Sequence, residues 1–247
     1  MGDLGTLPPS PKHIFRGDKV YQFKETYNKH QFFWFNKKLI ESEEWSMLPK
    51  SSKAVYPVIA CHCNKRGYAF PGEQTIASLA GISDKTARSG IHGLERLPTF
   101  SWKRYKTKNG NKGKKFKLVL AKRNRRGEAF PFYKFVLESG AWSELLPIAK
   151  ALYPVMRCFS YFNKKQYLGY EDYHNIKSDI KSDTSKLLHY EDRDCEFCEY
   201  RPGLLSDYAG IHRSKIKVAL ENLQENLLIE PDEYIENTWR VFLKNKR

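Results

Sequence analysis

Basic side chains are concentrated in one segment of the chain and are suited to binding phosphate. The 247 residues include 43 Lys and Arg against 28 Asp and Glu, which gives a formal net charge of +15. The segment from Pro98 to Gly127 has twelve basic residues and no acid, so it carries +12 and leaves +3 for the rest of the chain. The twelve are Lys103, Arg104, Lys106, Lys108, Lys112, Lys114, Lys115, Lys117, Lys122, Arg123, Arg125 and Arg126. A dense positive stripe is typical of a surface that contacts nucleic-acid phosphates, although a solvated, lysine-rich loop would have the same composition.

A Cys-x-x-Cys pair could bind a metal ion. Cys195 and Cys198 are separated by two residues, and His189 and His174 precede them. Two thiolates from a turn and two imidazoles could complete a tetrahedral structural zinc site. Since convincing zinc sites usually carry two such pairs, two free thiols in a loop are the alternative. The chain has five Cys, an odd number that favours reduced thiols or metal ligands over a disulfide framework.

The motifs of the common enzyme classes are missing from the sequence. It has no Gly-x-x-x-x-Gly-Lys loop, no Gly-x-Ser-x-Gly elbow and no His-Glu-x-x-His pair. We therefore expect a protein that is not an enzyme and requires no cofactor. No apolar run approaches the roughly 18 residues of a membrane helix, and residues 1–10 do not resemble a signal peptide. These features predict a cytoplasmic protein with no membrane partner.

An internal repeat divides the chain into two units. Residues 40–61 recur at 137–158 with a constant offset of 97 and eleven identities in 22 positions. Leu79–Ser83 then aligns with Tyr208–His212 at an offset of 129, which predicts an insertion of 32 residues in the second unit, at about 165–207. The predicted domains are an N-terminal arm at 1–30, a first unit at 31–121, a basic linker at 122–127 and a second unit at 128–247.

The first unit contains the pattern of a helix-turn-helix. Residues 72–97 begin with a short amphipathic helix, after which Gly81 supplies a tight turn and Ser83 is a plausible N-cap. The second helix buries Ala87 and Ile91 at helical spacing. The residues that we expect to contact bases and phosphates from this helix are Lys85, Thr86, Arg88, Ser89 and His92.

A basic hairpin follows the helix pair. Apolar and polar residues alternate on both sides of the Asn109-Gly110 turn, which is a strong hairpin signal. Three helices and a basic hairpin make a winged helix, in which the second helix of the pair enters the major groove and the wing follows the backbone. The expected contacts from this wing and the linker are Lys103, Arg104, Lys106, Lys108, Lys112, Lys114, Lys115, Arg123, Arg125 and Arg126.

Three stretches of the first unit resemble a known family. Lys53–Tyr56, Tyr68–Ala77 and Gly81–Arg88 are similar to the helix-turn-helix domain of plasmid and phage replication initiators and related regulators of mobile elements. The tandem arrangement resembles the initiators with two winged helices. The resemblance implies a mainly α fold with small β-hairpins (α+β), built as two tandem winged-helix domains. It also implies a sequence-specific protein that binds double-stranded DNA and acts as a replication initiator or a transcriptional regulator.

The second unit departs from this pattern. It lacks the Phe-Pro-Gly-Glu-Gln-Thr approach to the first helix, and its insertion is acidic, with nine acids against four basic residues from Glu171 to Glu199. Its recognition helix offers Arg213, Ser214 and Lys217, but the expected wing at 228–243 has four acids in its first nine residues. Phosphate would repel such a wing. The alternative function is therefore an adaptor in a nucleoprotein assembly, whose second domain binds a protein partner while the first tethers it to DNA. The sequence leaves the oligomeric state open.

Repeated aromatic and proline residues complete the pattern. Phe33, Trp34 and Phe35 favour packing, with a stacking platform for single-stranded nucleic acid as the alternative. Pro57 and Pro154 fall inside each unit's first long helix, so each helix is either kinked or begins later than the pattern implies.

Overall fold

The computed structural model describes residues 32–106, 110, 112–120, 128–161, 195–232 and 235–243. The expected N-terminal arm at 1–30 and the linker at 122–127 lie outside these residues, as does the segment 162–194. Within the described ranges, no helix is both long and apolar enough to cross a membrane.

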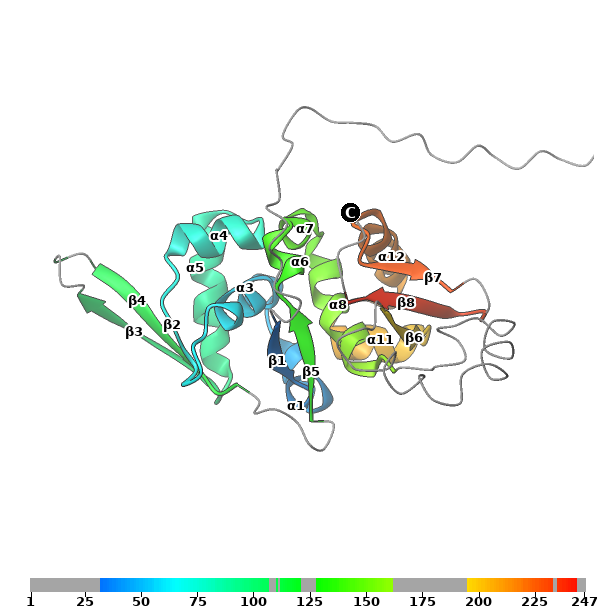
Figure 1. Cartoon of the computed structure of the whole chain (residues 1–247), viewed down its shortest axis with the longest axis horizontal. Coiled ribbons are helices and arrows are strands. Elements are labelled where there is room, and N and C mark those ends of the chain that lie inside the picture. Colours follow the sequence, from blue (N-terminus) through cyan, green and yellow to red (C-terminus); the bar gives the residue numbers. More distant parts are fainter. Residues whose placement is uncertain are drawn as a thin grey trace, which may run out of the picture.

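The described residues form short helices and small antiparallel sheets, which confirms a mixed α+β fold. The first half contains β1 (Phe32–Asn36), α1 (Lys38–Glu41), α2 (Glu44–Met47), α3 (Lys50–Cys61), β2 (Tyr68–Ala69), α4 (Glu73–Ala80), α5 (Asp84–Gly93), η1 (Leu94–Arg96), β3 (Phe100–Lys106) and β4 (Lys112–Leu118). The second half contains β5 (Ala129–Tyr133), α6 (Phe135–Glu138), α7 (Ala141–Glu144), α8 (Pro147–Phe159), β6 (Cys195–Glu199), α11 (Pro202–Ala209), η3 (Arg213–Lys215), α12 (Ile216–Glu225), β7 (Ile229–Pro231) and β8 (Thr238–Phe242). The strand orders are β1-β5, β2-β4-β3 and β6-β8-β7, and the two three-stranded sheets lie at opposite ends of the molecule (Figure 1).

The elements of the second half follow those of the first at the offsets found in the sequence. β5, α6, α7 and α8 begin 97 residues after β1, α1, α2 and α3, and α11 begins 129 residues after α4. β6 occupies the same edge position in its sheet as β2 does in the first half. Tyr68 of β2 pairs with Lys117, and Phe197 of β6, 129 residues after Tyr68, pairs with Arg240. Most of the range 165–207 expected to hold the insertion lies outside the described residues, and its C-terminal part contains β6 and the first residues of α11.

The two halves meet through aromatic side chains on β1 and β5, which pair antiparallel at the centre of the molecule (Figure 1). Phe33 stacks on Phe132 with ring centroids 5.1 Å apart, and Phe35 stacks on Phe130 at 5.0 Å. Phe33 is 7% exposed and Phe35 is fully buried. Packing is thus confirmed for these two residues, and they cannot serve as a stacking platform because their faces are covered.

Two tryptophans exchange equivalent hydrogen bonds across the same interface. Trp45 Nε1 donates to the carbonyl of Ala151 at 2.9 Å, and Trp142 Nε1 donates to the carbonyl of Ala54 at 3.0 Å. Trp45 and Ala54 lie 97 residues before Trp142 and Ala151. In an isologous interface, equivalent residues of the two units make the same contact in both directions. The two halves are therefore related by an approximate twofold axis.

The repeated prolines lie inside continuous helices. α3 passes through Pro57 and α8 passes through Pro154. The expectation that each helix begins after its proline is therefore wrong. Proline removes one backbone donor and costs about 3 kcal/mol in an isolated helix, but both helices lie in the shared core, where packing stabilises them.

A buried lysine also joins the halves, which the sequence did not predict. Lys53 is 1% exposed, and its ammonium donates to the carbonyls of Ser46 and Ala209, both at 2.9 Å. Ala209 ends α11, whose C-terminal carbonyls attract a cation. Burial lowers the pKa of Lys53 to about 8.

Candidate nucleic-acid interface

α4 and α5 form the helix pair that the sequence predicted. Gly81 ends α4 in the left-handed region, with φ of 61°. Ser83 caps α5, since the Thr86 N–H donates to Ser83 Oγ at 3.2 Å. The expected turn and cap are both confirmed.

Gly81 has a second role at the interface between the halves. A Cβ atom at this position would lie 2.0 Å from the carbonyl oxygen of Ser143 on α7. Gly210 ends α11 with φ of 60°, and a Cβ atom there would lie 2.1 Å from the carbonyl oxygen of Ser46 on α2. Each turn between helices is therefore held against the other half, which fixes the direction of the helix that follows.

One face of α5 is buried and the other is open. Gly90 lets α5 approach α3 closely, because a Cβ there would lie 2.6 Å from the carbonyl oxygen of Ser51. Four of the five predicted contact residues are exposed, namely Lys85, Arg88, Ser89 and His92. The fifth, Thr86, is half-buried, and its hydroxyl lies 2.8 Å from Ser83 Oγ, so it belongs to the cap.

Glu73 links this open face to the hairpin. Its carboxylate lies 2.6 Å from Arg88 Nε on α5 and 2.7 Å from Lys114 Nζ on β4. The hydrogen bonds from Lys114 and Arg88 hold the pKa of Glu73 below its usual value. Arg88 remains 57% exposed. One carboxylate, which the sequence analysis did not select, therefore joins α5 to the β3–β4 hairpin.

Lys114 differs from the other predicted wing contacts. Its side chain is 12% exposed, and its ammonium lies 4.3 Å from the centroid of the Trp102 ring. Its ammonium is therefore bound within the protein and is less open to solvent than the cations of β3. The exposed cations of β3 are Lys103, Arg104 and Lys106.

The hairpin itself is regular and strongly basic. β3 and β4 pair from Phe100 opposite Leu118 to Lys106 opposite Lys112, and the hairpin projects from one end of the molecule (Figure 1). Two cations, Lys103 on β3 and Lys115 on β4, lie directly opposite each other. Like charges directly across a strand pair are destabilising unless an anion is bound. The remaining predicted contacts lie outside the described side chains: Lys108, Lys112, Arg123, Arg125 and Arg126.

Comparison with known proteins supports this geometry in the first half. A family model described as a helix-turn-helix domain matches residues 47–97, which span α3, α4 and α5. These residues are therefore similar to a helix-turn-helix domain. No curated protein and no solved structure gave a match. A match to a helix-turn-helix domain suggests binding to double-stranded DNA.

A second helix pair lies outside the matched helix-turn-helix domain. The predicted contacts Arg213, Ser214 and Lys217 are all exposed on η3 and the first turn of α12. Ser214 also contributes to the cap, because its N–H donates to His212 Nδ1 at 3.3 Å. Val218 was missed by the sequence reasoning. It is 41% exposed and occupies the place of Ser89, 129 residues earlier.

The acids at the expected second wing are partly neutralised. Arg240 on β8 lies 3.0 Å from Asp232 and 3.6 Å from Glu230. The Asp232 carboxylate is buried and also accepts a hydrogen bond from the Ile235 N–H at 2.8 Å. The negative charge that we expected to repel phosphate is thus smaller than the sequence count implies, and Glu236 remains exposed.

The two cysteines of the predicted metal site do not form a turn. Cys195 and Cys198 lie in β6, where residues three apart point to opposite faces of the sheet. Their side chains belong to separate groups of buried residues. The expectation of a chelating turn is wrong, and His189 and His174 lie outside the described residues. Among the residues that are described, no group of three or more His, Cys, Asp or Glu is placed to hold a metal ion.

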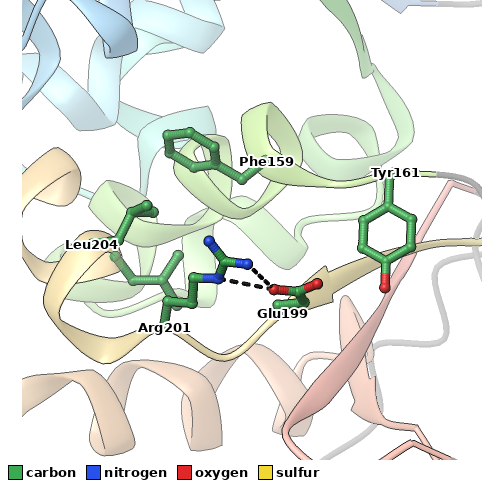
Figure 2. Close-up of a pocket in the computed structure, with 6 residues that line it drawn as sticks. Phe159, Tyr161, Glu199, Arg201 and Leu204 are labelled. Carbon is green, nitrogen blue, oxygen red and sulfur yellow. Dashed lines mark hydrogen bonds and ion pairs between the residues drawn. The ribbon is translucent and has the colours of Figure 1, made fainter.

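A pocket of about 200 Å³ lies between α8, β6 and α11 (Figure 2). Phe159 and Leu204 line its apolar side, and Tyr161 stands at its edge (Figure 2). Its one cation, Arg201, is paired with Glu199 within the pocket, with Nε donating to Oε2 at 2.8 Å. The pocket therefore has no net charge that would select an anionic ligand.

Proposed function

We propose that the protein binds specific sequences in double-stranded DNA through two tandem winged-helix domains. The observation that carries this proposal is the pairing of an open recognition helix, α5, with a basic hairpin through Glu73. The helix-turn-helix match at 47–97 supports DNA as the ligand. The repeat of element bounds in the second half supports a second domain of the same kind.

In the proposed complex α5 enters the major groove. Arg88 can donate to guanine, Ser89 can contact either base type, and His92 lies one turn further along the helix. Lys85, Arg104 and Lys106 contact phosphates and fix the register of the protein on the duplex. Glu73 orients Arg88 before binding, which lowers the cost of ordering a long side chain.

The approximate twofold axis suggests how the two domains share one site. Helices related by a twofold axis bind half-sites of inverted orientation. The half-sites need not have the same sequence, since Arg88 and Ser89 on α5 correspond to Lys217 and Val218 on α12. Val218 suits the C5-methyl group of thymine. We expect an imperfect inverted repeat as the target.

We further propose that the biological role is replication initiation or transcriptional regulation in a plasmid, phage or other mobile element. The resemblance of Tyr68–Ala77 and Gly81–Arg88 to initiator domains supports this context. An initiator is expected to bind repeated sites at an origin, whereas a regulator is expected to bind one short operator. The adaptor function remains the second candidate, favoured by the exposed Glu236 on the second wing.

Selection of bound sequences from a random duplex library tests the proposal. We expect enrichment of a site with two inverted, non-identical halves. Binding without enrichment would refute sequence-specific recognition and favour the adaptor. Genomic footprinting then separates repeated sites from a single operator.

A further inference from the structure

The outer face of the first wing carries a second group of aromatic and basic side chains. We define the outer wing face as Tyr68, Phe70, Lys103, Tyr105, Lys115 and Lys117. Strand register places these residues together, because Tyr68 is paired with Lys117, Lys115 with Lys103, and Tyr105 with Gly113. Lys114 and Trp102 alternate with them and point to the opposite face, toward Glu73.

The aromatic rings of the outer wing face are partly open. Phe70 is 49% exposed, although large apolar side chains are normally covered. Its ring contacts Tyr105 edge to face, with centroids 5.7 Å apart. Tyr105 in turn lies over Gly113, where a Cβ would be 2.8 Å from the Tyr105 ring. Phe70 and Tyr105 therefore form a fixed aromatic pair at the outer end of the hairpin.

Lysines surround this pair without acidic neighbours on the sheet. Lys115 Nζ lies 4.0 Å from the centroid of Tyr68 and 5.8 Å from that of Phe70. Strands β2, β3 and β4 contain no Asp or Glu. Two acids contact the hairpin from its other face, since Glu73 is bound to Lys114 and Glu95 accepts a hydrogen bond from Trp102. The outer wing face is thus positively charged and aromatic at once.

The second half does not repeat this surface in its described residues. Phe197, at the place of Tyr68, is fully buried and pairs with Tyr161. Glu199 stands at the place of Phe70, 129 residues later. Arg240, at the place of Lys117, is bound to Asp232. The outer wing face is therefore particular to the first half and is not required by the fold.

We propose that the outer wing face binds single-stranded DNA. Unpaired bases stack on Phe70 and Tyr105, and the backbone phosphates contact Lys103 and Lys115. Aromatic rings interleaved with lysines are the combination that single-stranded nucleic acid requires. A duplex cannot use the rings, because its base faces are already stacked. Since this face lies opposite Lys114 and Glu73, α5 can hold a duplex while the outer wing face holds an unpaired strand. The inference rests on the proposed function only in that both take DNA as the ligand.

The test measures binding of a short fluorescein-labelled oligo(dT) to the full chain by anisotropy. Phe70→Leu keeps an apolar side chain but removes the ring, and Phe70→Trp restores a ring. We expect Phe70→Leu to weaken oligo(dT) binding between about fivefold and about 150-fold, the range for one stacked base. Phe70→Trp should bind as tightly as the wild type, and Lys103→Gln should weaken binding and reduce its salt dependence.

Two controls separate this inference from the proposed function. Met47→Ala removes another exposed apolar side chain, 76% exposed on α2, and should leave oligo(dT) binding unchanged. The affinity of Phe70→Leu for a selected duplex should equal that of the wild type. Failure of the wild type to bind oligo(dT), or equal losses on oligo(dT) and duplex, would overturn the inference. Absence of sequence preference on duplex DNA would instead overturn the proposed function and leave the oligo(dT) result valid.

Discussion

Glu73 offers the sharpest test of how the recognition helix and the wing are coupled. The substitution Glu73→Gln keeps the shape of the side chain and removes its charge. Lys114, only 12% exposed over Trp102, then loses its ionic partner. Arg88 loses the carboxylate that holds its Nε at 2.6 Å. The variant should therefore affect both the stability of the wing and the selectivity of α5.

The contribution to stability comes mainly from Lys114. The ion pair at 2.7 Å is more shielded than a surface pair, since Glu73 is 28% exposed and Lys114 12%. Surface pairs contribute about 0.2–1 kcal/mol and hydrogen bonds to charged groups about 1.5–3 kcal/mol. Because Gln can still accept one hydrogen bond, we expect a coupling free energy of about 1–2 kcal/mol between the two residues. The pKa of Glu73 is lowered in the folded state, so this contribution is present at neutral pH and is lost on acidification below the ordinary carboxyl value of 4.5.

A double-mutant cycle with Glu73→Gln and Lys114→Met measures this coupling by urea unfolding. The same proteins are then assayed on a selected duplex and on a duplex with a changed first half-site. We expect Glu73→Gln to reduce the ratio of the two affinities, because Arg88 is no longer oriented. A coupling free energy near zero together with an unchanged affinity ratio would refute the role assigned to Glu73.

Three further predictions concern the wing and the buried groups. If Lys85, Arg104 and Lys106 each contact one phosphate, affinity for duplex DNA should fall roughly fortyfold between about 50 and about 200 mM salt. Lys106→Gln should weaken binding to all DNA sequences alike. An affinity that does not change with salt would exclude these contacts. Burial lowers the pKa of Lys53 from 10.5 to about 8, so the unfolded chain binds more protons than the folded protein between these pH values. The stability of the wild type relative to Lys53→Met should therefore rise with pH over that range. Denaturant titrations that show no such rise would contradict this prediction. Burial raises the pKa of the Cys198 thiol to about 12, so the native protein should react slowly with iodoacetamide at this residue. Modification at the rate of a free thiol would contradict this prediction and show that β6 opens readily.

Local features of the fold could be predicted from the sequence. The turn at Gly81, the cap at Ser83 and the buried face of α5 depend on residues within a few positions of one another. The Asn109-Gly110 dipeptide likewise predicted the pairing of β3 with β4. The offset of 97 located β5 through α8 because the two segments kept the same spacing.

Features that depend on distant residues could not be predicted. Glu73 and Lys114 are 41 positions apart, and only the folded hairpin brings Lys114 onto Trp102 and the carboxylate. Cys195 and Cys198 suggested a chelating turn because their spacing is local. Pairing with β8, more than 40 residues away, makes that segment a strand and separates the two thiols. The exposure of Phe70 also depends on how β2 joins the sheet.

The central claim is that α5 identifies DNA bases through Arg88, and one measurement tests it directly. Sequence selection from a random duplex library is carried out with the wild type and with Arg88→Ala. We expect the wild type to enrich a site with two inverted halves and Arg88→Ala to lose the preference at one or two positions of a single half-site. The same enriched site from both proteins would contradict base recognition by α5.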